Sequence, residues 1–323
     1  MISLRQHIFS LVAVFVALAV GIAAGSTVVR GPLLDSTRAR LESAEENIAL
    51  ERTENDVLAA EVAQLDNWAV DGPAQLLEAQ LQDTAVVLVV AGDVDADVVE
   101  GMVRSLRTAQ AMLLGEIRIA PAVFDPAQVD RVLATLDDAA LEGVDTAEPA
   151  KVGAAFGTEV GRLVAGVAAE VTDGPSVAAD ELLRSAFGDY EDAGLVDLLE
   201  LTRDEIDADA VELVVLTDRN LAADPAPVLG GVIAVSDPAA AGLRVLVAEV
   251  GRLLQDNDAP MPSFVEEIRG DGRLRDEVST VDNAETILGW LAVVIGLQAL
   301  LEGVVDHYGF REGAARAFPS RSS

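Results

Sequence analysis

The feature that most constrains this chain is an uncharged run from Ile8 to Val29, which lies between Arg5 and Arg30. About 20 apolar helical residues cross the hydrocarbon layer of a bilayer, so the run is long enough to span it. A removable signal peptide has a shorter apolar centre, although the small residues near the end of this run leave cleavage as an alternative. We therefore expect residues 1–30 to form a retained, single-pass membrane anchor.

The arginines beside this run bear on its orientation. Arg5 favours a cytoplasmic amino end, whereas Arg30, Arg38 and Arg40 argue weakly for the reverse. We expect the amino end inside and the bulk of the chain on the extracytoplasmic side of the cell membrane or envelope. The choice between an inner and an outer membrane stays open.

Residues 31–70 contain a long stretch without Gly or Pro, LLDSTRARLESAEENIALERTENDVLAAEVAQLDNWAV. Apolar residues recur in it with a seven-residue period, which is typical of a coiled coil. A buried asparagine within such a seam fixes register and pairing, while Thr37 and Glu51 weaken the seam. We expect a stalk that joins two copies of the chain or an envelope partner, with a lone amphipathic helix as the alternative. The predicted interface consists of Leu34, Leu41, Ile48, Asn55, Leu58, Val62 and Leu65.

Composition excludes several classes of function. Asp and Glu number 55 against 22 Lys and Arg, which gives a formal charge of -33. Such a field repels phosphate backbones, so we do not expect nucleic-acid binding. The chain has no cysteine and therefore no thiolate nucleophile or thiolate metal site. The acidic surface either keeps the fold soluble or attracts cations, and the first explanation is the simpler one.

The pattern changes after Asp71-Gly72-Pro73, and residues 71–323 are expected to form an extracytoplasmic α/β domain. The run TAVVLVVAG is continuous and β-branched, which indicates a strand buried on both faces. Helix-like segments alternate with further strand-like runs at AMLLGEIRIA, VELVVLTD and GGVIAVSD. Alternation of this kind predicts a Rossmann-like, mostly parallel sheet with helices on both faces.

Two further helical regions are expected in this domain. An Ala-rich helical insertion spans about 126–205 and includes ELLRSAFGDYEDAGLVDLLEL. Near the end of the chain, residues 287–305 are apolar enough to be considered as a second membrane span, but Gln298 and Glu302 favour a helix packed on the sheet. Helix starts are expected at Asp125-Pro126 and Asp237-Pro238, and Asp282 with Glu285 resembles a capping box.

The sequence holds few candidates for chemistry, and we expect a protein that is not an enzyme and has no cofactor. It lacks the nucleophile elbow, the P-loop, the dinucleotide fingerprint and the zinc-helix motif. Asp93, Asp95 and Asp97 resemble the start of a calcium loop, but Val98 stands where glycine is required and Arg104 where a glutamate is required. These acids are expected to cap a helix.

His307 is the one histidine outside the membrane region, since His7 lies beside the apolar run. A single imidazole with no cysteine and four scattered methionines cannot build a copper cage, so no metal ligand is assigned. We expect His307 to end the last helix and to interact with its final carbonyl groups.

Three stretches carry a family resemblance: MISLRQH with the apolar run that follows it, VVLVVAGDVDADVVEGMVRSLRTAQAMLLGEIRI, and the ending from STVDN to DHYG. With them the chain resembles the actinobacterial MctB-like family of copper transport outer membrane proteins. The resemblance implies an envelope protein with a role in copper transport or homeostasis. It also implies an alternative: a non-catalytic coiled-coil scaffold that pairs with a membrane partner and regulates peptidoglycan hydrolysis during growth and division.

The stalk hypothesis can be tested at Asn55. Replacing Asn55 by leucine removes the buried amide that favours one register and pairing. We expect Asn55→Leu to change the oligomeric state of the full chain, measured by analytical ultracentrifugation in detergent. Unchanged assembly would contradict the proposed seam.

Overall fold

The structure is a computed structural model in which two compact units, Met1–Asn67 and Trp68–Ser323, are distinguished. It describes residues 7–23, 41, 48, 52, 77, 79–173, 178–199, 201–203, 205–206, 208–218, 225–234, 243–251 and 263–315. In the first unit an apolar helix covers His7–Ala23, and its side chains are exposed.

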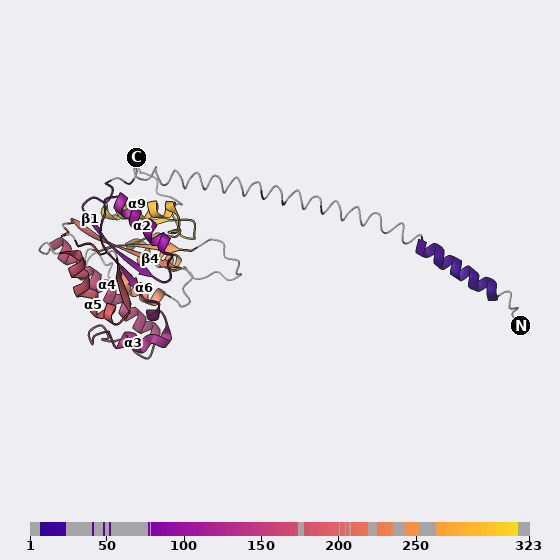
Figure 1. The fold of residues 1–323 in the computed structure, drawn as a ribbon, viewed down its shortest axis with the longest axis horizontal. Helices are drawn as coiled ribbons and strands as arrows, with labels where there is room; N and C mark the ends of the chain where they lie inside the picture. Colours follow the sequence, from indigo (N-terminus) through magenta and orange to yellow (C-terminus); the bar gives the residue numbers. More distant parts are fainter. Residues whose placement is uncertain are drawn as a thin grey trace. The chain divides into compact units, whose positions relative to one another are not determined.

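The second unit is built around a seven-stranded sheet with the order β3-β2-β1-β4-β5-β6-β7 (Figure 1). All pairs are parallel except β2 with β3. The expected α/β class and mostly parallel sheet are confirmed, and the closer Rossmann-like assignment stays a prediction. The strands are β1 (Thr84–Ala91), β2 (Met112–Ile119), β3 (Val196–Leu199), β4 (Ala210–Asp218), β5 (Arg244–Val250), β6 (Val278–Val281) and β7 (His307–Tyr308).

Helices cover the sheet on both faces. The α-helices are α2 (Ala96–Thr108), α3 (Val129–Leu133), α4 (Pro149–Asp173), α5 (Ala179–Asp192), α6 (Ala226–Ile233), α7 (Phe264–Gly270), α8 (Leu274–Glu277) and α9 (Ile287–Leu301). Two short 3₁₀ helices lie at Pro121–Val123 and Pro126–Gln128. The second begins as expected, because Asp125 accepts a hydrogen bond from the backbone of Ala127 and Pro126 follows it.

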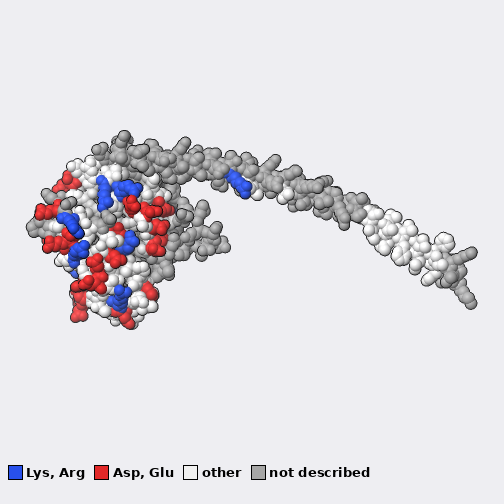
Figure 2. Space-filling model, in the orientation of Figure 1, with Lys and Arg blue, Asp and Glu red and all other residues white. Residues whose placement is uncertain are grey.

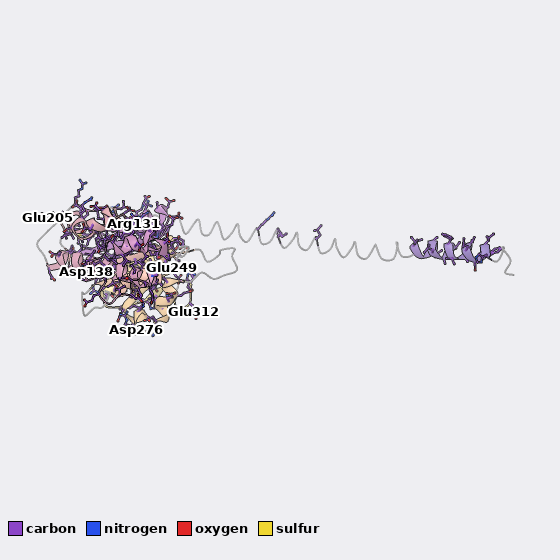
Figure 3. The ribbon with its side chains drawn as sticks, turned by 90° about the horizontal axis from the view of Figure 1, so that it is seen from below. Arg131, Asp138, Glu205, Glu249, Asp276 and Glu312 are labelled. Carbon is purple, nitrogen blue, oxygen red and sulfur yellow. The ribbon has the colours of Figure 1, made fainter. Side chains whose placement is uncertain are left out.

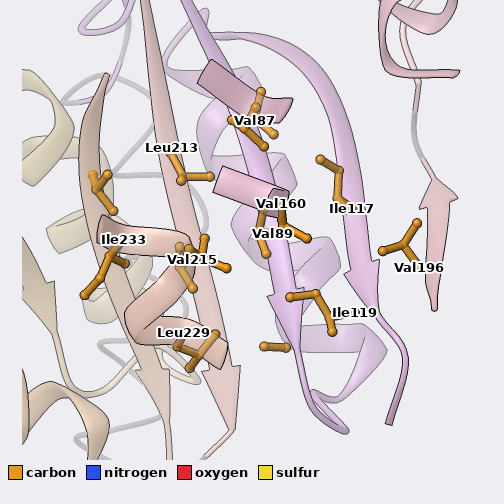
Figure 4. Close-up of a cluster of buried hydrophobic side chains, with 14 of the residues drawn as sticks. Val87, Val89, Ile117, Ile119, Val160, Val196, Leu213, Val215, Leu229 and Ile233 are labelled. Carbon is orange, nitrogen blue, oxygen red and sulfur yellow. The ribbon is translucent and has the colours of Figure 1, made fainter. Parts of the chain in front are cut away.

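Two apolar cores lie on either side of the sheet. Side chains alternate along β1, so Val87 and Val89 enter the core beneath α4 to α7, while Val86 and Leu88 enter the core beneath α2 and α9. Figure 4 shows the first core, where Val160 of α4 and Leu229 of α6 approach the strands. A strand buried on both faces explains why its sequence is continuously apolar.

The contact between α4 and α6 depends on glycine. A Cβ on Gly157 would lie 1.9 Å from the carbonyl oxygen of Val228, and one on Gly231 would lie 2.3 Å from the carbonyl oxygen of Ala154. Such distances are shorter than any tolerable contact, so the two helix backbones touch directly. The segment GGVIAVSD was predicted to be a strand. This prediction is wrong for residues 230–233, which belong to the helix α6. The strand at this place in the sheet is Arg244–Val250 instead.

The region 126–205 was expected to be a helical insertion, but it also contains a strand. Its helices α4 and α5 pack on the sheet, and LVDLL is not helical but contributes the edge strand β3. Gly194, whose φ is +62°, ends α5 before this run, and pairing with β2 then makes the run a strand. The guanidinium of Arg131 then donates to the carbonyl of Ala193 at 2.9 Å through Nε, which satisfies the end of that helix.

The last helix packs on the sheet as expected, with Gln298 half-buried and Glu302 exposed at its end. Its expected start was wrong, because the N-cap is Thr286, whose side chain accepts from the backbone of Gly289 at 3.0 Å. Asp282 does not cap this helix but forms an ion pair with Arg269. Asp237 lies outside the described residues, so its helix start stays a prediction.

Each edge of the sheet is covered in part. On β3, the backbone N–H of Leu198 donates to the carboxylate of Glu191 at 3.4 Å. On β7, the carbonyl of His307 accepts from the backbone of Ala315 at 2.9 Å. Short, covered edge strands prevent pairing with strands of other chains.

The glycine contact gives a prediction about stability. Gly157→Ala forces α4 away from α6 and should lower the free energy of unfolding by roughly 1–3 kcal/mol or more. Gly166 lies in the same helix with nothing within 4 Å of a Cβ. Gly166→Ala should therefore be neutral or stabilising by up to about 1 kcal/mol, as alanine favours helix. Urea unfolding of both variants measures the difference, and equal effects would contradict the direct backbone contact.

Candidate functional site

The carboxyl edge of the parallel strands is the first place to look for a site, because ligands of open α/β sheets bind there. The strands end nearly level, since Ala91 of β1 pairs with Thr217 of β4, and Thr217 pairs with Glu249 of β5. Polar residues gather at the ends of β5, β6 and β7, and several of them are buried: Glu249, Ser263, Arg269, Thr280, Asp282, Asp306 and His307.

The acids after β1 lie at this edge but do not form the expected cap. Asp95 occupies the N-cap position of α2 without a side-chain hydrogen bond, and Asp97 lies in the first turn. Asp93, Asp95 and Asp97 are exposed. Within the described part of the chain, no three His, Cys, Asp or Glu residues are placed to hold a metal ion.

Arg269 of α7 is the centre of the buried polar cluster. Its Nη1 donates to Oδ2 of Asp282 at 2.6 Å, and both side chains are 1% exposed. Its Nε donates to the hydroxyl of Thr280 at 2.8 Å, and its Nη2 donates to the carbonyl of Tyr308 at 2.8 Å. A buried ion pair is tolerated when further hydrogen bonds support it, and all three nitrogens of this guanidinium donate to a partner.

Asp282 holds the closing segment of the domain. Its two oxygens accept from the backbone N–H groups of Phe310 and Arg311 at 2.8 and 3.0 Å. Gly309 makes this possible, because its φ is +133° and a Cβ there would lie 2.1 Å from Oδ1 of Asp282. Glu249 plays a similar part toward α7, accepting from the hydroxyl of Ser263 at 2.6 Å. The cluster thus fastens α7 and residues 306–312 to the sheet.

His307 does not end the last helix, which stops at Leu301, but lies in the edge strand β7. Its Nδ1 is 2.9 Å from the hydroxyl of Thr280, and its Nε2 is 3.1 Å from the carbonyl of Arg275 in α8. The carbonyl of Arg275 can only accept, so Nε2 carries the ring proton, and in the neutral imidazole Nδ1 then accepts from the hydroxyl of Thr280. His307 is therefore the neutral imidazole with its proton on Nε2, donating to Arg275.

Both ring nitrogens of His307 are in use, so the lone pair on Nδ1 is not available to a metal. Burial, together with the nearby positive charge of Arg269, lowers the pKa of His307 below its ordinary value. The structure thus supports a structural role for His307, although at a strand rather than at a helix end.

Another buried acid, Glu212, lies away from this cluster. Glu212 of β4 is 0% exposed, and neither carboxylate oxygen has a hydrogen-bond partner. Burial raises its pKa to about 8, and the charge of Arg244 offsets only part of this effect. Glu212 therefore carries a proton at neutral pH.

Two residues of the predicted stalk interface belong to the described part of the chain. Leu34, Asn55, Leu58, Val62 and Leu65 lie outside the described residues. Leu41 and Ile48 are described, and both are helical with 60% and 49% of their surface exposed.

Comparison with known proteins decides the family. The family model for the copper transport outer membrane protein MctB matches residues 1–319. The chain belongs to the MctB family. Among its relatives, the copper transporter MctB of Mycobacterium tuberculosis is 26% identical over 97% of this chain and 98% of the relative. The copper transporter MctB of Mycobacterium leprae is 27% identical, with the same coverage of both chains.

The MctB match confirms the resemblance read from the chain's three motifs, but several residues were missed by sequence reasoning. Glu212 is flanked by apolar residues inside the strand VELVVLTD, whereas Asp218 lies at its end, and this placement was a signal for a buried carboxyl group. Arg269 and Asp282 gave no such signal. They are 13 residues apart, and only the fold shows that they form a pair.

Glu212 gives a prediction about pH. Its folded pKa is raised above the ordinary 4.5, so its contribution to stability is fully present below about pH 4.5 and is lost as pH rises to about 8. Glu212→Gln cannot lose a proton. We expect this variant to gain stability relative to the wild type between those pH values, by roughly 3–5 kcal/mol at most.

Urea unfolding at several pH values measures this difference. Glu302→Gln removes the same formal charge from an exposed position and serves as the control for net charge. A constant difference between Glu212→Gln and the wild type from pH 4.5 to pH 8 would contradict the buried, uncompensated carboxyl group.

Proposed function

We propose that this chain is a membrane-anchored protein of the cell envelope that takes part in the passage or homeostasis of copper. The observation that carries the proposal is the family match over residues 1–319, which includes the apolar amino-terminal helix as well as the α/β domain. The names of the mycobacterial relatives, copper transporter MctB, point to the same role.

The chain's ligand chemistry bears on how copper is handled. Copper(I) prefers thiolate and thioether ligands, and copper(II) takes imidazole readily. The sequence has no cysteine, four methionines and two histidines, and the nitrogens of His307 are hydrogen-bonded within the domain. We therefore propose that copper is a transient cargo rather than a resident ion. A formal charge of -33 raises the local concentration of cations and supports such a role.

The anchor is assigned to the amino-terminal helix. Within the described residues, one helix, Pro149–Asp173, is long and apolar enough to cross a membrane. That helix is α4, and its residues Phe156, Val160 and Val164 are fully buried in the core of the domain. The helix His7–Ala23 is shorter in the described residues, but its apolar side chains are exposed and its sequence continues uncharged to Val29. We propose a single-pass topology with the domain outside.

A second candidate function is a non-enzymatic scaffold that joins a membrane partner through the stalk and regulates peptidoglycan hydrolysis. One observation favours association through this segment: Leu41 and Ile48, one heptad apart, are both exposed in the single chain. Apolar side chains at that spacing are buried when a second helix packs against them.

Growth in copper tests the first proposal. A strain lacking this chain should be more sensitive to copper than its parent, and the full chain should restore tolerance. A chain without residues 1–30 should not restore it, because the proposed role requires the membrane. His307→Gln should still restore tolerance if the variant is folded, since His307 is not proposed as a copper ligand.

Equal copper sensitivity of the deletion strain and its parent would contradict the copper role. If that strain instead shows a division defect, and an envelope protein co-purifies only when residues 33–70 are present, the scaffold is the better account. A reporter fused to the domain that is active in the cytosol would contradict the topology.

A further inference from the structure

Two adjoining cavities form a groove on the flank of the domain, where α2, α5 and the edge of the sheet meet. Their volumes are about 690 and 670 Å³, and they share Arg107 and Leu199 in their linings. We call this the arginine groove, after its basic residues Arg104, Arg107, Arg118, Arg184 and Arg203.

The groove exists because the sheet extends past its covering helix. α5 packs on β3 from one face, while on the other face α2 packs against β2. Leu199 at the end of β3 therefore keeps 42% of its surface exposed. Together with the half-buried Leu201, it forms an apolar floor.

Backbone hydrogen bonds hold the walls in place. The N–H of Thr202 donates to the carbonyl of Leu114 in β2 at 3.3 Å, and the N–H of Asp180 donates to the carbonyl of Thr202 at 3.0 Å. An isolated bridge also joins Ala178 to Glu205. The segment that carries Arg203 is thus fixed between β2 and the start of α5, so little ordering is needed when a ligand binds.

The charge of the groove differs from that of the rest of the chain. Its lining contains five arginines against four acids, Glu100, Glu116, Asp180 and Glu205. In the whole chain 22 basic residues face 55 acidic ones. Figure 2 shows basic side chains near α2 on a face that also carries many acidic groups.

Three of the five arginines are already engaged, because Arg104 and Arg118 form ion pairs within the lining and Arg107 also has a partner. Arg104 contacts Glu100 at 2.6 Å, and Arg118 contacts the buried Glu116 at 2.7 Å. Arg184 and Arg203 are exposed and lie in the other cavity, beside Thr202. In Figure 3, Glu205 of this lining lies at the edge of the domain, away from Glu249 and Glu312, and the lining shares no residue with the buried polar cluster.

We propose that the arginine groove binds an extended anionic ligand that carries carboxylate or phosphate groups. Guanidinium groups bind both anions through paired, charge-assisted hydrogen bonds, and Leu199 with Leu201 accommodates an apolar part of the ligand. Arg184 and Arg203 are the exposed guanidinium groups that face the first cavity, and they are the groups that a bound anion contacts. The inference does not depend on the copper proposal.

Isothermal titration calorimetry tests the proposal with the full chain in neutral detergent, in a buffer free of phosphate and copper. Citrate is the carboxylate probe and pyrophosphate is the phosphate probe, while triethyl citrate tests the need for charge. We expect saturable binding of at least one anion and none of the ester. Arg184→Gln/Arg203→Gln should weaken that binding about tenfold or more, because hydrogen bonds between charged groups are lost.

The matched control is Arg273→Gln/Arg275→Gln, which removes the same charge from exposed side chains outside the groove. This variant should bind within about twofold of the wild type, because long-range charge contributes little once salt screens it. Thermal unfolding shows whether both variants are folded. Binding by citrate alone or by pyrophosphate alone would identify the anion, whereas no saturable binding, or equal loss in both variants, would overturn the proposal.

Discussion

The structure depends on the burial of a parallel sheet on both of its faces. Val86 to Val90 of β1 are all 0% exposed, and successive side chains enter different cores. Each fully buried apolar side chain contributes about 1.5–3 kcal/mol relative to exposure, so neither layer of helices can be removed. The close approach of α4 to α6, made possible by Gly157 and Gly231, follows from the same requirement. It brings α6 into the core that it shares with α4, where Leu229 and Ile233 are fully buried.

The sequence predicted those elements whose character is local. TAVVLVVAG and VELVVLTD were recognised as strands because a continuous β-branched run admits few alternatives. The strand prediction for GGVIAVSD was wrong, because Gly231 serves a close helix contact with α4, which lies about 70 residues earlier in the chain. The helix prediction for LVDLL was wrong, because a short apolar run does not distinguish a strand from a helix. Pairing with β2 makes this run a strand.

The candidate site was harder to predict than the fold. A structural role for His307 followed from the scarcity of ligands, but its partners Thr280 and Arg275 are 27 and 32 residues earlier in the sequence. The arginine groove draws its lining from α2, β2, β3 and α5. No spacing rule connects residues from four separate elements, so this surface could be recognised only in three dimensions.

The hydrogen bonds at the two sheet edges affect how copies of this chain associate when they are crowded together. At β3 a glutamate occupies an outward amide, and at β7 the chain's own closing segment occupies an outward carbonyl. Neighbouring copies therefore gain little by lengthening the sheet, even at high local density. Recognition by other chains is left to side-chain surfaces, where it can be selective and reversible rather than cumulative.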